Sequence, residues 1–150
     1  LYTTSILAKS EALAGGYDEA ILLNQDGSVS EGSGENLFLV RDGVISTPSE
    51  TDNCLLGITR DSVIQLAKNE LNMEVVQRHI HRSELYLADE IFLTGTAAHL
   101  TSVGELDNRV IATGLTGAVT KQLQDLYFST VVGDNDRYAN WCTFVTLSGG

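Results

Sequence analysis

Three short stretches of this chain combine glycine with groups that can bind a charged ligand. They are EGSGEN (31–36), LLGIT (55–59) and TGTAA (94–98), and each follows an extended segment or opens a helix. Glycine lets a backbone approach a ligand closely, because it has no side chain to cover the amides. The residue types therefore predict anion binding by the second and third stretches and a carboxylate role for the first.

The stretch LLGIT has the clearest physical basis. Gly57, Ile58 and Thr59 stand directly before an apolar pattern with helical spacing. The first amides of a helix have no partner within the helix, and the helix dipole adds positive potential there. Such a start can bind phosphate, and the Thr59 hydroxyl can act as a further donor or as the N-cap. Taken alone, the stretch is better explained as an ordinary capped helix.

The stretch TGTAA offers similar groups. Gly95, Thr96 and Ala97 follow the apolar run IFL, and small residues in a row let several amides face one ligand. They could hold a second side of a phosphate or a substrate carboxylate. Small residues are common after strands, so this stretch alone is a weak signal.

Glu31 would complete such a site. A carboxylate beside a ring nitrogen keeps that nitrogen protonated, because the opposite charge favours the cation. One acid and two phosphate-type turns describe a charged aromatic cofactor that carries a phosphate, and pyridoxal 5'-phosphate fits this description. His79, His81 and His99 lack the spacing of a metal-ligand set, so no metal is expected.

The segments that must position these turns alternate between helical and extended patterns. Helices are expected near residues 1–14, from the cap Thr59 through Leu71, within 82–89 with Ser83 as cap, and from about 116 to 130. Strands are expected at 19–24, 28–31, 36–40, 44–47, 73–80 and 90–95, with Asp26-Gly27 as a hairpin turn. This order predicts an α+β (mixed α/β) fold with antiparallel pairs in its sheet.

Composition narrows the class of protein. The 150 residues suit one domain, and 20 acidic residues against 9 basic ones give a net charge of −11, which disfavours a nucleic-acid partner. No apolar run reaches the ~18 residues that span a bilayer, so no membrane partner is expected. Cys54 and Cys142 have no metal spacing and are interpreted as reduced thiols of a cytoplasmic protein.

Five motifs in one order resemble a known family. They are SEALAGGYDEAILL, VSEGSGENLFLV, LLGITRDSVIQLA, SELYLADEIFLTGTAAHLT and GAVTKQLQ. Together they resemble the C-terminal, larger domain of branched-chain amino acid aminotransferases, which are fold-type IV pyridoxal-phosphate enzymes. The resemblance runs from Tyr2 to about Trp141. It implies an antiparallel-rich sheet or pseudo-barrel with flanking helices.

The resemblance also implies roles for residues around the cofactor ring. Glu31 is similar to the family's glutamate that pairs with the pyridine nitrogen, and Tyr2 to the tyrosine near the phenolic oxygen. Leu55 resembles the residue that packs on the ring. Glu35 and Asn36 belong to the same motif and are expected to fix the turn that presents Glu31.

Phosphate and substrate contacts are implied in the same way. Gly57, Ile58 and Thr59 resemble the phosphate cup at the helix start, and Thr96 the family's second phosphate contact. The amides of Thr96 and Ala97 match the place where the family holds the substrate carboxylate.

One departure concerns the Schiff-base lysine, which in the family lies a few residues before the tyrosine matched by Tyr2. That position would lie upstream of Leu1, so no catalytic lysine is expected in residues 1–150. Lys9, Lys68 and Lys121 are interpreted as solvated helical residues. The family's N-terminal small domain is not matched either, and the isolated chain is expected to be inactive.

The implied activity is transamination of branched-chain L-amino acids with 2-oxoglutarate by the full-length enzyme. Two alternatives share the fold: D-amino acid aminotransferase and aminodeoxychorismate lyase. A third hypothesis is that the chain is an inactive cofactor-binding domain without the Schiff-base lysine. The expected partners are small-molecule amino acids and 2-oxo acids, in a cytoplasmic homo-oligomer that is a dimer or larger.

Overall fold

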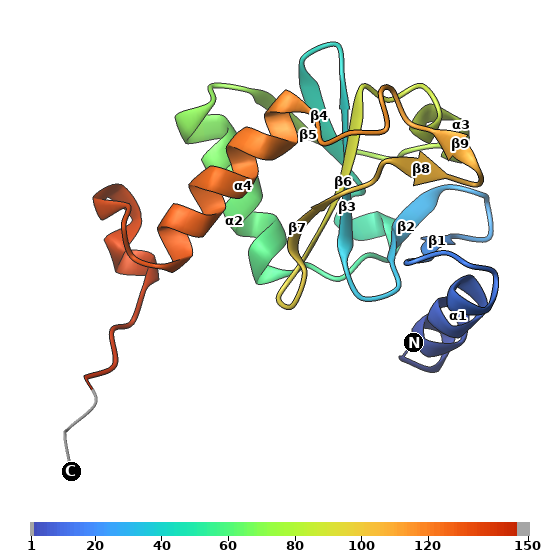
Figure 1. Cartoon of the computed structure of the whole chain (residues 1–150), viewed down its shortest axis with the longest axis horizontal. Helices are drawn as coiled ribbons and strands as arrows, with labels where there is room; N and C mark the ends of the chain where they lie inside the picture. The colour runs from blue at the N-terminus through green and yellow to red at the C-terminus, as the bar shows by residue number, and fades with distance from the viewer. Residues whose placement is uncertain (1, 147–150) are drawn as a thin grey trace.

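The fold is built around a five-stranded sheet in the order β5-β4-β3-β6-β7 (Figure 1). The computed structural model describes residues 2–146, with the side chain of Tyr2 outside the description. The strands are β3 (Asn36–Arg41), β4 (Val44–Thr47), β5 (Glu74–Gln77), β6 (Glu90–Gly95) and β7 (His99–Ser102). Every pair is antiparallel except β4 with β5, which confirms the expected antiparallel-rich sheet.

The central pair β3 and β6 carries hydrophobic side chains on both faces, because the sheet is covered on both sides. Phe38 and Phe92 are opposite each other in the register and stack with ring centroids 4.9 Å apart. Leu37 and Leu93, one position along, point to the other face and belong to a second cluster. The period of two that defines a strand thus divides the core into two halves.

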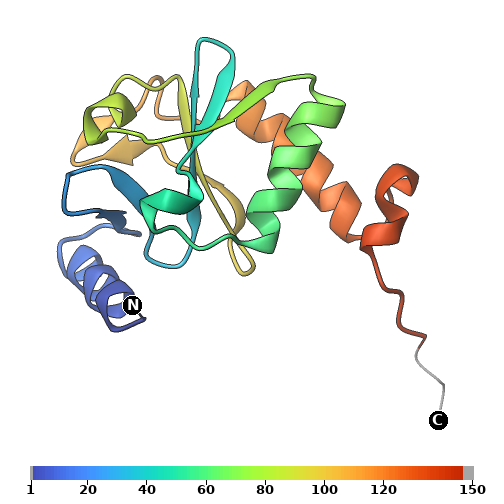
Figure 2. The same cartoon turned by 180° about the vertical axis from the view of Figure 1, so that it is seen from behind.

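Two helices cover the Phe38 face. α2 (Ile58–Glu70) and α4 (Ala118–Val131) lie side by side there, as Figure 2 shows from behind. Val63, Leu66 and Leu123 are fully buried between the helices and the sheet. The helical spacing of these residues is the pattern that predicted both helices.

The Leu37 face is covered by shorter elements. The hairpin β1 (Ile21–Leu23) and β2 (Val29–Gly32), the short helix α3 (Arg82–Leu85), and the hairpin β8 (Glu105–Leu106) and β9 (Arg109–Val110) surround it. The β1–β2 pairing confirms the predicted turn, in which Gly27 has a positive φ of 83°. A hairpin needs such a conformation, which glycine adopts without strain.

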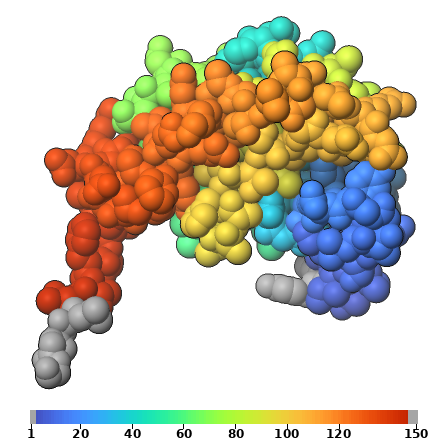
Figure 3. All heavy atoms as spheres, viewed as in Figure 1, coloured from blue at the N-terminus to red at the C-terminus, as the bar shows by residue number. Residues whose placement is uncertain are grey.

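The two ends of the described chain lie apart from the sheet. α1 (Tyr2–Ala14) forms a separate lobe, and the segment after η2 (Asp136–Trp141) extends on the opposite side (Figure 3). α1 exposes Ile6, Leu7 and Leu13 to solvent. Of the helices among residues 2–146, none has the length and apolarity needed to cross a membrane.

Two predicted helix caps are wrong. α2 begins at the N-cap Gly57, not Thr59, and the Thr59 side chain is buried instead. α3 begins at His81, not Ser83, and the Glu84 carboxylate accepts the His81 amide hydrogen at 2.8 Å. In both cases a residue outside the apolar pattern occupies the cap, which the pattern alone does not reveal.

Candidate functional site

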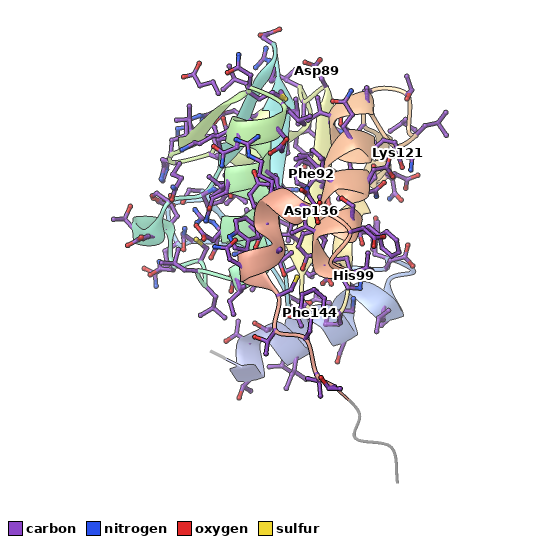
Figure 4. All side chains as sticks on the ribbon, turned by 90° about the vertical axis from the view of Figure 1, so that its left-hand side faces the viewer. Asp89, Phe92, His99, Lys121, Asp136 and Phe144 are labelled. Atoms are coloured by element: carbon purple, nitrogen blue, oxygen red, sulfur yellow. The ribbon has the colours of Figure 1, made fainter. Side chains whose placement is uncertain are left out.

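The fold brings the three glycine-bearing turns to one end of the sheet. EGSGEN leads from β2 into β3, and TGTAA connects β6 to β7, with Asn36 and Thr94 paired in the register. A Cβ atom on Gly95 would lie 3.1 Å from the Glu35 Cγ, so the two turns are in contact. Figure 4 shows His99 at this end of the molecule and Asp89 at the other.

Glu31 joins the first turn to the second. It lies in β2, is partly buried, and its Oε2 accepts a hydrogen bond from the Leu55 amide at 2.8 Å. The turn after Glu31 is closed by a 2.7 Å hydrogen bond from the Gly32 amide to the Glu35 carbonyl. The carboxylate is therefore held in place by the backbone of LLGIT, and its Oε1 accepts no hydrogen bond from the residues that the structure describes.

Asn36 makes a second connection to LLGIT. Its Nδ2 donates to the Leu55 carbonyl at 2.6 Å, and its side chain is buried. A Cβ atom on Gly57 would lie only 2.6 Å from the Asn36 Oδ1. Position 57 consequently requires glycine for space, and Asn36 fixes the helix start as well as the first turn. From the sequence, Asn36 was expected to fix only the turn that presents Glu31.

The start of α2 has no side-chain cap. Gly57 is extended, with φ −68° and ψ 144°, and the first helical hydrogen bond runs from the Asp61 amide to its carbonyl at 3.1 Å. The amides of Ile58, Thr59 and Arg60 precede that bond and have no partner within the helix. This arrangement fits an anionic ligand.

The start of α4 is built in the opposite way. The Glu90 carboxylate accepts hydrogen bonds from the amides of Val119 at 3.0 Å and Thr120 at 2.8 Å. A Cβ atom on Gly117 would lie 2.0 Å from the Glu90 Cδ, so glycine makes room for this carboxylate. An acid of the chain itself thus satisfies the first amides of α4, whereas no side chain among the described residues caps the start of α2.

Several predicted contact residues are exposed around these amides. Leu55 is 70% exposed and Ile58 87%, and Thr96 and Ala97 lie in the exposed turn between β6 and β7. The Thr59 side chain differs, because its hydroxyl lies 3.4 Å from the Tyr127 hydroxyl between α2 and α4. Only the backbone amide of Thr59 remains for a ligand. Tyr2 lies in α1, and its side chain is outside the described residues.

Glu35 does not hold the first turn through its side chain. Its backbone carbonyl closes the turn, while its Oε2 is buried without a hydrogen-bond partner among the described residues. Burial raises the pKa of the Glu35 carboxyl above its ordinary value, and the nearby Glu19 carboxylate raises it further. The turn-fixing role expected for Glu35 is thus carried out by its main chain.

Lys68 and Lys121 lie away from the three turns, whereas Lys9 is linked to the first turn, because its partner Glu19 accepts a hydrogen bond from the Ser33 hydroxyl. Lys9 pairs with Glu19 at 2.9 Å, and Lys121 pairs with Asp125 at 2.7 Å on α4. Lys68 is exposed near the end of α2, opposite the helix start. Lys121 also lies toward the Asp89 end of the molecule in Figure 4.

A cavity of about 800 Å³ lies elsewhere, between α1 and the β7–β8 region. Its walls include Ala12, Tyr17, Arg82, Val103 and Leu106. None of the residues of the three turns lines it, but two of its wall residues, Glu19 and Ala20, accept hydrogen bonds from Ser33, so the cavity adjoins the first turn.

Known proteins resemble this chain over most of its length. The family model for amino-transferase class IV matches residues 1–106. The chain is 58% identical over 142 residues to a probable branched-chain-amino-acid aminotransferase of Aquifex aeolicus, covering 95% of this chain and 46% of that protein. It is 49% identical to the branched-chain-amino-acid aminotransferase of Pseudomonas aeruginosa, covering 96% and 46%. The chain thus spans about half the length of the curated relatives it matches.

Solved structures give the same result. The Thermobaculum terrenum branched-chain amino acid aminotransferase in its PLP form superposes with a TM-score of 0.92 at 46% identity, covering 95% of this chain and 46% of that one. The Escherichia coli branched-chain amino acid aminotransferase gives 0.83 at 49% identity, covering 85% and 43%. These matches confirm the fold expected from the five motifs. The chain belongs to the amino-transferase class IV family.

Proposed function

We propose that this chain supplies the cofactor-binding side of a pyridoxal-phosphate-dependent transaminase that exchanges amino groups between branched-chain L-amino acids and 2-oxoglutarate. The observation that carries the proposal is the joining of the three turns. Glu31 and Asn36 both bind the main chain of Leu55, and the open amides of α2 follow directly. The names of the relatives support the branched-chain substrates.

Glu31 is the proposed partner of the pyridine nitrogen. Its Oε2 accepts the Leu55 amide hydrogen, so the carboxylate has a fixed orientation at the site. A carboxylate held there favours the protonated ring. When bound, pyridoxal phosphate supplies an electron-withdrawing ring that accepts the electron pair left when the substrate loses its α-proton. Glu31 would support this chemistry by stabilising the protonated, cationic ring that accepts the electron pair.

The phosphate is assigned to the amides of Ile58 and Thr59, with Gly57 providing the close approach of the backbone. Thr96, in the neighbouring turn, is the proposed second phosphate contact. The amides of Thr96 and Ala97 are also the proposed site of the substrate carboxylate. Leu55 would pack on the ring, and Tyr2 would bind near its phenolic oxygen.

We further propose that residues 1–150 correspond to the C-terminal domain of the family and that the covalent lysine and the small domain come from elsewhere. Lys9 and Lys121 are paired with acids, and Lys68 lies at the far end of α2. By this proposal the isolated chain is inactive. Borohydride reduction of the intact protein with pyridoxal phosphate should fix the cofactor on none of these three lysines, as read by intact and peptide mass.

The test of Glu31 is its replacement by glutamine. Glu31→Gln keeps an acceptor for the Leu55 amide but removes the charge, so kcat of the full-length enzyme should fall about 10²–10³-fold. Glu50→Gln is the matched control, because Glu50 is an exposed acid in η1 (Glu50–Asp52). Equal activity of Glu31→Gln and Glu50→Gln would overturn the assignment.

The assembly and compartment are proposed from the family. We expect a homodimer or larger in the cytoplasm, which agrees with two cysteines that form no disulfide within the described residues. α1 exposes Ile6, Leu7 and Leu13, and such apolar surface favours association. Light scattering of the intact protein at high concentration tests this, and a monomer would contradict it.

A further inference from the structure

We propose that Arg60 is the fixed positive charge that attracts the cofactor phosphate to the start of α2, acting through space and not by contact. This inference rests on the proposed function and adds a residue that the family resemblance did not assign to the phosphate. Its burial, its partners and the charges around it support the new role.

Arg60 is a buried guanidinium with neutral partners. Its side chain is 4% exposed, and its Nη2 donates to the Pro48 carbonyl at 3.0 Å and to the Gln77 Oε1 at 2.9 Å. The Nε is buried and has no hydrogen-bond partner among the described residues. The charge is therefore incompletely satisfied by the fold.

No carboxylate in the described part of the chain lies within 4.0 Å of Arg60. By contrast, an acid pairs with each of four other arginines: Arg41, Arg78, Arg82 and Arg137. An unpaired buried charge is unfavourable, because it loses hydration without gaining a counter-ion. A bound anion near the charge would offset this loss.

Arg60 lies in the first turn of α2, the helix start that forms the proposed phosphate site. Arg60 is the third residue of α2, and its own amide is one of those without a helical partner. Its guanidinium also lies near Cys54, just before LLGIT: burial raises the pKa of the Cys54 thiol, and Arg60 opposes that shift. Arg60 and the Cys54 thiol both donate to the Pro48 carbonyl, Arg60 at 3.0 Å and Cys54 at 3.6 Å.

The charges around the start of α2 are mostly negative. The chain has a net charge of −11, and Glu31, Glu50 and Asp61 lie at or near the turn and the helix start. Arg60 is the single basic residue between positions 42 and 67. Without it the local charges would repel a phosphate, despite the favourable amides.

Gln77→Glu is the most informative variant. It places a carboxylate at the position that now accepts from Arg60 at 2.9 Å, so it neutralises the charge while keeping the hydrogen bond. Gln122→Glu, on the exposed side of α4, adds the same charge away from the site and is the matched control. Arg60→Gln removes the cation directly, and Arg60→Lys keeps it.

The readout is the ratio of the dissociation constants of pyridoxal and pyridoxal 5'-phosphate, measured by equilibrium dialysis of the intact protein. Loss of packing alone weakens the binding of both ligands and leaves the ratio unchanged. Loss of phosphate attraction weakens the binding of pyridoxal 5'-phosphate only, and so lowers the ratio. We expect Gln77→Glu and Arg60→Gln to lower it about tenfold, or about 1.4 kcal/mol. Gln122→Glu and Arg60→Lys should stay within about threefold of wild type, since neither removes the charge beside the helix start.

Each outcome has one meaning. An unchanged ratio in Gln77→Glu overturns the role of Arg60, even when both ligands bind more weakly. If Arg60→Gln does not fold, Gln77→Glu still decides the question, because Arg60 and its contacts are retained. A wild-type protein that binds pyridoxal 5'-phosphate no better than pyridoxal would instead overturn the proposed function.

Discussion

Replacement of Gly57 by alanine tests how the first turn and the helix start are joined. The new Cβ atom would lie 2.6 Å from the Asn36 Oδ1, well inside contact distance, whereas φ at Gly57 is −68°, which alanine tolerates. The Asn36 side chain must move, and its 2.6 Å hydrogen bond to the Leu55 carbonyl is lost. Backbone strain is not involved, so the contact with Asn36 is the main source of the effect.

The magnitude follows from three contributions. A buried group left without its hydrogen bond costs roughly 1–3 kcal/mol. Alanine is a poorer N-cap than glycine, which lowers stability by several tenths of a kcal/mol. Alanine also reduces the conformational freedom of the unfolded chain, which raises stability by about 0.4–1 kcal/mol. We therefore expect Gly57→Ala to lower the free energy of unfolding by about 1–3 kcal/mol, and Tm by roughly 2–10 °C.

The assay is denaturant unfolding together with a double-mutant cycle. Gly34→Ala, in the same turn region, is the matched control, because its Cβ would meet no atom within 4 Å. In an Asn36→Ala background the cost of Gly57→Ala should nearly disappear, since the clashing atom is gone. An equal cost in both backgrounds would refute the reasoning.

Two further predictions concern carboxylates that the structure places near the sheet ends. Glu90→Gln should lower the free energy of unfolding by about 1–2 kcal/mol in denaturant titration, because the amides of Val119 and Thr120 lose a charged acceptor, and an unchanged midpoint would contradict this. Glu35→Gln should raise the free energy of unfolding at neutral pH. Burial raises the pKa of the Glu35 carboxyl in the folded state above its value in the unfolded chain. Wild type therefore loses stability as pH rises through the interval between these two pKa values, whereas the glutamine variant does not. The difference between Glu35→Gln and wild type should vanish below about pH 4, where the wild-type carboxyl is protonated in both states, and thermal unfolding across pH checks it.

The order of elements was predictable where a local pattern decides it. The continuous apolar runs in NLFLV and EIFLTG predicted β3 and β6, and the apolar spacing after LLGIT predicted α2. α4 was expected from about 116 and begins at Ala118, with Leu123 buried as predicted. These segments have enough residues for an apolar pattern to be visible.

Other elements were missed because they are short. β7, β8 and β9 have two to four residues each, too few to show a period. One signal for the β8–β9 hairpin was present: Asp107 and Asn108 both adopt positive φ, at 51° and 62°, which these residue types tolerate in hairpin turns.

The sequence identified the three turns that the fold brings together, but not the contacts that join them. EGSGEN, LLGIT and TGTAA were identified from glycine placement and from the family resemblance, and the structure shows them in contact. The hydrogen bonds between Asn36 and Leu55, and between Glu90 and the start of α4, join residues 19 to 30 positions apart. Such contacts depend on tertiary packing, so no local pattern reveals them.

The most direct test is a crystal structure of the intact protein with pyridoxal 5'-phosphate. The phosphate should lie against the amides of Ile58 and Thr59, and the ring nitrogen should lie beside the Glu31 carboxylate. Cofactor density in the cavity between α1 and the β7–β8 region, with no ligand at the start of α2, would contradict the proposed site.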